Sequence, residues 1–113
     1  MPAKSNIPAA EALALTALIA YTEQGISSRV LADSGGGNVT LFAFDEGQEL
    51  SEHASPYEVF LEVLEGSLVV TVGGTRVRAA PGTVVRIPAN SPHAIESPAR
   101  SKMLLVMLRG RGT

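Results

Sequence analysis

From residue 26 onward, short apolar or alternating segments are separated by breaks rich in glycine, proline and asparagine. The segments occupy about residues 26–32, 39–44, 59–64, 67–72, 75–79, 83–87, 93–97 and 102–108. Runs of this length, with side chains alternating between apolar and polar and bounded by turn residues, are typical of β-strands. The pattern therefore predicts an all-β domain, built as an antiparallel sandwich or barrel.

Alternation within the strands predicts which side chains face the core. In the segment 59–64, Val59, Leu61 and Val63 share one face, and Phe60 lies on the other. The segment 102–108 is almost wholly apolar, so we expect it to be buried on both faces. Within it, Met103 and Met107 share a face and would pack in the core or line an apolar pocket.

Residues 8–20 follow a different pattern. Pro8 suits a first helical position, several alanines follow, and Leu15, Leu18 and Ile19 fall on one helical face. The spacing predicts a short helix over about residues 8–20, lying across one end of the β structure. With 113 residues in all, we expect a single domain spanning 1–113, with its barrel core over about 26–108.

Composition excludes several classes of function. The net charge of −2 argues against binding to nucleic acid. No cysteine is present, which removes disulfides and thiolate metal ligands. The longest nearly apolar run, Ala12 to Ala20, is shorter than the roughly 20 residues that a membrane helix needs. We therefore expect no membrane span and a cytoplasmic location.

The two histidines of the chain occupy matched contexts. His53 closes the segment that begins at Gly47, and His93 closes the segment that begins at Pro88. Imidazole is the commonest metal ligand in proteins and the usual acid or base near neutral pH. Two histidines at the ends of two β segments therefore predict one shared pocket.

These two segments resemble the paired motifs of the cupin superfamily. Gly47, His53 and Gly66 stand at the separations of the first motif, and Gly82, Pro88 and His93 at those of the second. Asn90 stands where the second motif has glycine, and Ser97 where it has asparagine. The resemblance covers about residues 39–108. It implies a small single-domain cupin: a jelly-roll-like antiparallel β-barrel with a short N-terminal helix.

The resemblance also has implications for partners and metals. Small cupins commonly pair their sheets, which implies a homodimer, and the outward Phe60 would favour burial in such an interface. Family members hold a divalent metal with three histidines and a glutamate. Here His53 and His93 match, but Ser55 and Val59 replace the other two ligands. Two imidazoles fall short of the usual zinc or iron ligand set, so a divalent metal could be held only by an incomplete site.

Three functions are open on this basis. The first hypothesis is a binding module that holds a small organic molecule in the barrel, with His53 and His93 as polar anchors. A second hypothesis is a metal-dependent enzyme of the dioxygenase, isomerase or decarboxylase type, with both histidines as ligands. A third is a metal-free enzyme similar to sugar epimerases, with a histidine base and Tyr57 as the acid. The candidate ligand-binding residues are His53, Ser55, Tyr57, Val59, Leu61, His93 and Met103.

Overall fold

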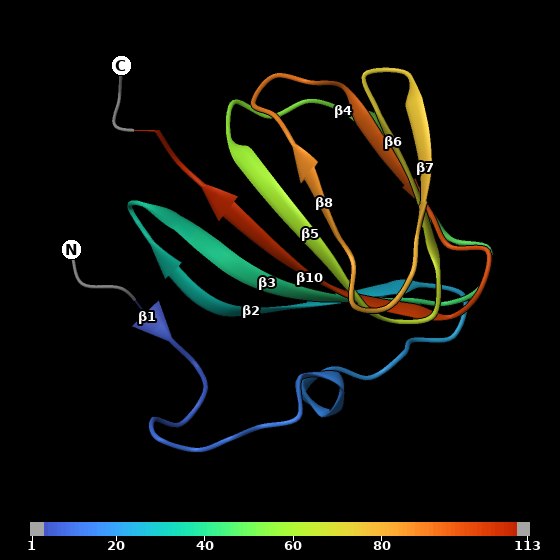
Figure 1. Cartoon of the computed structure of the whole chain (residues 1–113). Coiled ribbons are helices and arrows are strands. Elements are labelled where there is room, and N and C mark those ends of the chain that lie inside the picture. Colours follow the sequence, from blue (N-terminus) through green and yellow to red (C-terminus); the bar gives the residue numbers. More distant parts are fainter. Residues whose placement is uncertain (1–3, 111–113) are drawn as a thin grey trace.

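The computed structural model describes residues 4–110, which form two antiparallel β-sheets that face each other (Figure 1). The larger sheet has the strand order β1-β2-β3-β10-β5-β8, and the smaller has the order β4-β9-β6-β7. The strands are β1 (Lys4–Ser5), β2 (Ile26–Ser34), β3 (Gly37–Phe44), β4 (Glu49–His53), β5 (Glu58–Glu65), β6 (Leu68–Val72), β7 (Thr75–Ala79), β8 (Val84–Ile87), β9 (His93–Glu96) and β10 (Ser101–Leu108).

The predicted all-β architecture is confirmed. Each of the eight predicted segments coincides with a strand to within two residues at either end. Two strands were not among those eight segments: the short β1 and β4, which ends at His53. Residues 1–3 and 111–113 of the predicted domain lie outside the described residues.

The predicted helix over residues 8–20 is wrong for most of its length. A single 3-10 turn, η1 (Leu15–Leu18), is the only helical element between residues 4 and 110. The carbonyl of Thr16 accepts a hydrogen bond from Lys102 Nζ at 2.6 Å, and that of Leu18 accepts one from Arg29 Nη1 at 3.0 Å. The carbonyl of Thr16, which an α-helix would pair with the amide of Ala20, is thus bound to a side chain of the sheet. A helix this short is marginal unless tertiary contacts stabilise it, and here the tertiary contacts stabilise an irregular backbone conformation instead.

The segment still buries the apolar side chains that suggested a helical face. Leu15, Leu18 and Ile19 pack with Leu41 and Ala43 on the outer side of the larger sheet. Figure 1 shows this segment running beneath that sheet between β1 and β2. The apolar positions were therefore identified correctly, but they belong to a mostly irregular segment that packs on the sheet rather than to a helix.

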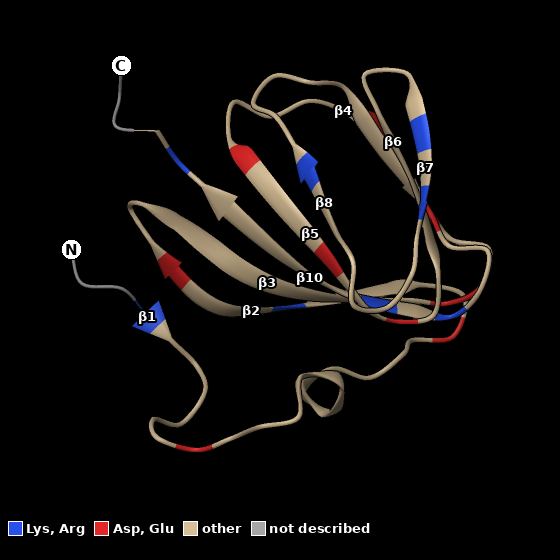
Figure 2. Cartoon of the chain, in the orientation of Figure 1, with Lys and Arg blue, Asp and Glu red and all other residues tan. Residues whose placement is uncertain are grey.

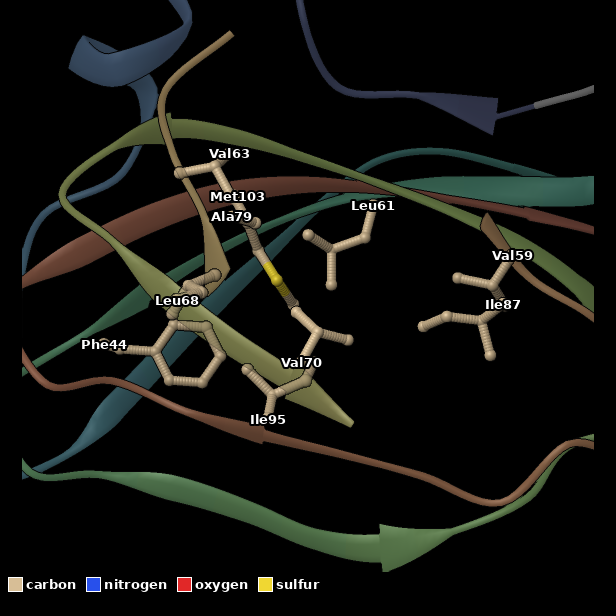
Figure 3. Packing of buried hydrophobic residues seen from close by; sticks show 10 residues of the cluster. All are labelled: Phe44, Val59, Leu61, Val63, Leu68, Val70, Ala79, Ile87, Ile95 and Met103. Atoms are coloured by element: carbon tan, nitrogen blue, oxygen red, sulfur yellow. The ribbon is translucent and has the colours of Figure 1, made fainter. Parts of the chain in front are cut away.

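The main core lies between the two sheets. Val59, Leu61 and Val63 on β5 are 2%, 0% and 0% exposed, as alternation predicted. Strand β10 lies between β3 and β5, and its Met103 is fully buried. Figure 3 shows the ten buried side chains of this cluster gathered between the strands: Phe44, Val59, Leu61, Val63, Leu68, Val70, Ala79, Ile87, Ile95 and Met103.

Charged positions are dispersed over the two sheets and their loops (Figure 2). Strand β3 carries none, while β7 carries Arg76 and Arg78 on its outward face. No helix among residues 4–110 is long and apolar enough to cross a bilayer. The cytoplasmic location stays a prediction.

Gly66 lies in the turn between β5 and β6, where the backbone approaches another segment closely. Its φ is +83°, and a Cβ added there would lie 2.1 Å from the carbonyl oxygen of Arg100. The neighbouring Ser101 hydroxyl accepts a hydrogen bond from Ser67 N at 2.9 Å. Only glycine combines this conformation with so close an approach of backbone to backbone.

Candidate functional site

His53 and His93 face each other across neighbouring strands. His53 ends β4, His93 begins β9, and the two residues are register partners in the smaller sheet. Their ring centroids are 4.2 Å apart, with the ring planes inclined at 60°. His93 is buried, whereas His53 is exposed. The prediction that the two histidines share one location is consistent with this arrangement.

Both rings are oriented by the same local hydrogen bond. Nδ1 of His53 lies 2.9 Å from the carbonyl oxygen of Ser51, and Nδ1 of His93 lies 2.9 Å from that of Ser91. A carbonyl oxygen only accepts, so each Nδ1 must carry the proton and donate it. In the neutral ring Nε2 is then an acceptor with a free lone pair. Neither Nε2 has a hydrogen-bond partner among the described residues.

A cavity of about 200 Å³ lies beside the two rings, between the sheets. The larger sheet contributes side chains from β3, β5 and β10, and the smaller contributes side chains from β4 and β9. One lining residue, Ser55, comes from the loop between β4 and β5. The lining residues are Phe42, Leu50, His53, Ser55, Val59, His93, Ile95, Leu105 and Met107.

The predicted site residues divide into two groups. His53, Ser55, Val59 and His93 line the cavity, and they come from β4, the loop after it, β5 and β9 respectively. Tyr57, Leu61 and Met103 do not line it; Leu61 and Met103 are fully buried in the core. Tyr57 instead packs its ring under the guanidinium of Arg109, whose Cζ lies 5.5 Å from the ring centroid.

Sequence reasoning missed four of the cavity residues: Phe42, Leu50, Ile95 and Leu105. A signal for one of them was available, because Leu105 lies between Met103 and Met107 on the same face of β10. Met107, which was expected to pack in the core or line a pocket, does line the cavity. The position of Phe42, Leu50 and Ile95 depends on strand pairing between distant segments.

The loop that precedes His93 also positions Ser55. Asn90 N–H donates to the carbonyl of Ser55 at 2.7 Å, and Ser91 N–H donates to that of Pro88 at 3.2 Å. Asn90 has φ +67°, a left-handed conformation that asparagine tolerates better than most residues other than glycine. Asn90 therefore satisfies the backbone requirement of the glycine that it replaces, and the turn before His93 is preserved.

Ser97 holds together the other end of the two strands. It is buried, and its hydroxyl lies 2.7 Å from the carbonyl of Asp45 and 3.0 Å from both the carbonyl and the amide N of Gln48. The hydroxyl oxygen accepts from the N–H of Gln48, and its single proton is shared between the two carbonyl oxygens. The hydroxyl joins the start of β4 to the end of β9, and so helps to set the register in which the two histidines meet.

The donor set of the cavity does not fit a three-ligand metal centre. Among residues 4–110, no three histidine, cysteine or carboxylate side chains are close enough to hold one ion. Glu58 cannot complete the pair, because its carboxylate forms an ion pair with Arg86 on the outward face of the sheet. The register of β5 with β8 runs regularly from Val59 to Glu62, so no bulge turns Glu58 inward.

Comparison with known proteins gives a consistent result. The cupin domain family model matches residues 40–108. A conserved protein of unknown function from Streptococcus pyogenes is 30% identical, with a TM-score of 0.91 over 99% of this chain and 98% of that one. A cupin superfamily protein from Desulfitobacterium hafniense is 31% identical, with a TM-score of 0.88 over 94% and 97%. None of the curated proteins matches the sequence.

Proposed function

The chain belongs to the cupin family, and we propose that its barrel binds a small organic molecule with His53 and His93 as polar anchors. The observation that carries this proposal is an apolar cavity lined by two imidazoles whose Nε2 atoms have no hydrogen-bond partner among the described residues. Pockets for small molecules are mostly apolar, with a few polar groups that orient the ligand. The barrel has this composition.

The size of the cavity limits the ligand. At about 200 Å³ it lies below the roughly 300–1,000 Å³ of pockets for drug-sized molecules. An apolar cavity of about 150 Å³ is sufficient for benzene. We therefore expect a ligand of about one ring, with its apolar part against Leu50, Ile95 and Leu105 and its polar part toward the histidines.

Two alternatives are less well supported. A metal-dependent enzyme would have to hold a divalent ion with two imidazoles, and the donor set described above does not complete a usual ligand shell. An enzyme similar to sugar epimerases would use Tyr57 as its acid, and Tyr57 does not line the cavity. Both alternatives remain outcomes of the experiment below.

A fragment screen tests the proposal. Uniformly 15N-labelled protein, purified without chelator or affinity metal, is titrated with single-ring compounds, and amide shifts are mapped. We expect shifts to cluster at cavity residues in the native chain and to weaken in His53→Ala and in His93→Ala. Arg78→Ala is a matched control, because Arg78 is exposed on the outward face of β7. Shifts that map elsewhere, or that persist unchanged in both histidine variants, would overturn the proposal.

Elemental analysis of the same preparations addresses the enzyme alternative. Stoichiometric metal in the native chain, lost in both histidine variants, would favour the metal-dependent enzyme over the binding module. If the protein is a binding module, the two histidine substitutions do not change its metal content. One preparation of each protein therefore distinguishes the two hypotheses.

We also propose that two chains pair through the outward face of the larger sheet. Phe60 is half-buried there, next to Val106 in register, and Val84 and Leu108 are 61% and 45% exposed. These residues share the side of the sheet opposite to the core, beyond the part covered by residues 7–21. Sedimentation at micromolar concentration should give a dimer for the native chain and a monomer for Phe60→Glu. A monomeric native chain would refute the pairing.

A further inference from the structure

The hydrogen bonds of the two histidines restrict the chemistry of the ligand head group. Both Nδ1–H groups are already committed to carbonyl oxygens of Ser51 and Ser91. The atoms left for a ligand are the two Nε2 lone pairs, which only accept. An organic ligand that pairs with them in the neutral rings must therefore donate a proton into a hydrogen bond. A head group that can only accept, such as a carboxylate, would place its own lone pairs opposite those of Nε2.

The rest of the cavity agrees with a neutral head group. No lysine, arginine, aspartate or glutamate is among its lining residues. A carboxylate or phosphate would thus lose its hydration without gaining a cation in return, which is unfavourable in an apolar site. The Ser55 hydroxyl is the one other polar side chain in the lining, and it can either donate or accept.

The apolar lining favours an aromatic body. Phe42 and Met107 both line the cavity, and aromatic rings and thioether sulfur make favourable contacts with a further ring. The volume of about 200 Å³ accommodates one ring with a short substituent. A phenolic hydroxyl remains protonated at neutral pH and is a good donor, since the phenol of tyrosine has a pKa of about 10.

We infer that the cavity selects a neutral single-ring phenol, which donates its hydroxyl proton to Nε2 of the His53–His93 pair. The inference rests on the proposed function and adds the class of ligand to it. Both rings line the cavity with their centroids 4.2 Å apart, so a second hydroxyl on the neighbouring carbon could use the other Nε2. Binding here is hydrogen bonding only, and no bond is made or broken.

Three compounds with the same ring test the inference. Phenol donates and accepts, anisole carries oxygen but cannot donate, and benzoate only accepts. Dissociation constants are measured by 15N-resolved titration at pH 8.5, above the range in which histidine side chains ordinarily titrate. We expect phenol to bind at least tenfold more tightly than either of the others, because a site built to pair a hydroxyl rejects analogues that leave its polar atoms unpaired.

A variant separates the hydrogen bond from packing. His53→Phe removes one acceptor but retains a ring at an exposed position, so folding should be preserved. Phenol has one proton to donate and pairs with one Nε2 at a time, so it should bind at least tenfold more weakly to His53→Phe or to His93→Phe, whereas the affinity for anisole should change less than threefold in both. Arg78→Ala should alter neither value. Retention of phenol affinity in both His53→Phe and His93→Phe would overturn the inference.

The outcomes distinguish this inference from the proposed function. Anisole or benzoate binding as tightly as phenol overturns the phenol selectivity and leaves the binding module intact. If none of the three binds while the fragment screen finds another cavity ligand, the inference alone fails. If no compound of either set binds in the cavity, both fail.

Discussion

Replacing Gly66 with alanine separates two reasons for glycine at the β5–β6 turn. One is its backbone conformation, with φ +83°, and the other is the close approach of Arg100. Gly47 is a matched control, because it has φ +81° but nothing within 4 Å of an added Cβ. Gly47→Ala therefore reports conformation alone, and Gly66→Ala reports conformation together with steric overlap.

The magnitude follows from these distances. A left-handed conformation costs alanine about 1–2 kcal/mol, and this applies to both variants. At Gly66 the new Cβ would also lie 2.1 Å from the Arg100 carbonyl oxygen and 2.4 Å from Ser101 Oγ, well inside normal contact. Relieving this overlap by moving backbone costs about 1–3 kcal/mol, and losing the bond from Ser67 N to Ser101 Oγ adds about 1 kcal/mol. We expect Gly66→Ala to be less stable than Gly47→Ala by about 2–4 kcal/mol.

Urea denaturation followed by far-ultraviolet circular dichroism measures the difference. With a denaturant slope of about 1–3 kcal/mol per molar, the two midpoints should differ by roughly 1 M or more. Equal midpoints would refute the reasoning, because they would mean that conformation alone requires glycine at residue 66. A larger loss in Gly47→Ala would likewise contradict the contacts assigned to Gly66.

Three further predictions concern residues around the site. Val59→Glu places a carboxylate beside two imidazoles at a position 2% exposed, so the variant should be less stable than the native chain without metal. Zn²⁺ should raise its melting temperature more than that of the native chain, and an equal rise would contradict the placement of Val59. Asn90→Gly should retain stability to within about 0.5 kcal/mol, whereas Asn90→Ala should lose about 1 kcal/mol, and the reverse order in chemical denaturation would argue against a left-handed turn. The Arg100 guanidinium bonds the carboxylate of Asp45 and lowers its pKa from 3.8 to about 2. Because the pKa of Asp45 is lower in the folded than in the unfolded protein, its ionised form stabilises the fold. This stabilisation is complete above the pKa of the unfolded state and is lost as pH falls from about 4 through about 2. Arg100→Gln should therefore flatten this part of the curve of unfolding free energy against pH.

The parts of the fold that were predicted share a local cause. Period-two alternation follows from backbone geometry within one strand, so the inward set Val59, Leu61 and Val63 could be identified without knowledge of their neighbours. The helix over residues 8–20 failed for the opposite reason. Its pattern of leucines suits a helix, but contacts with Lys102 and Arg29, far away in sequence, decide the conformation.

The candidate site divides in the same way. Motif spacing was sufficient to place His53 and His93 near one another, and to identify Ser55 and Val59 beside them. It was insufficient for Leu61, which shares a strand face with Val59 but lies deeper, where core side chains fill the barrel. Which inward positions line a cavity depends on how far the opposite sheet fills the interior.

By itself, the sequence determined eight of the ten strands described between residues 4 and 110, their inward faces and the turns, because each is encoded in residues close together in the chain. The expected shared location of the two histidines came from their matched contexts and from the resemblance to the cupin motifs. The tertiary structure decided the path of the N-terminal segment, the outward ion pair of Glu58 and the lining of the cavity. These properties arise where distant segments meet, and hydrogen bonding and packing between them have no local signature.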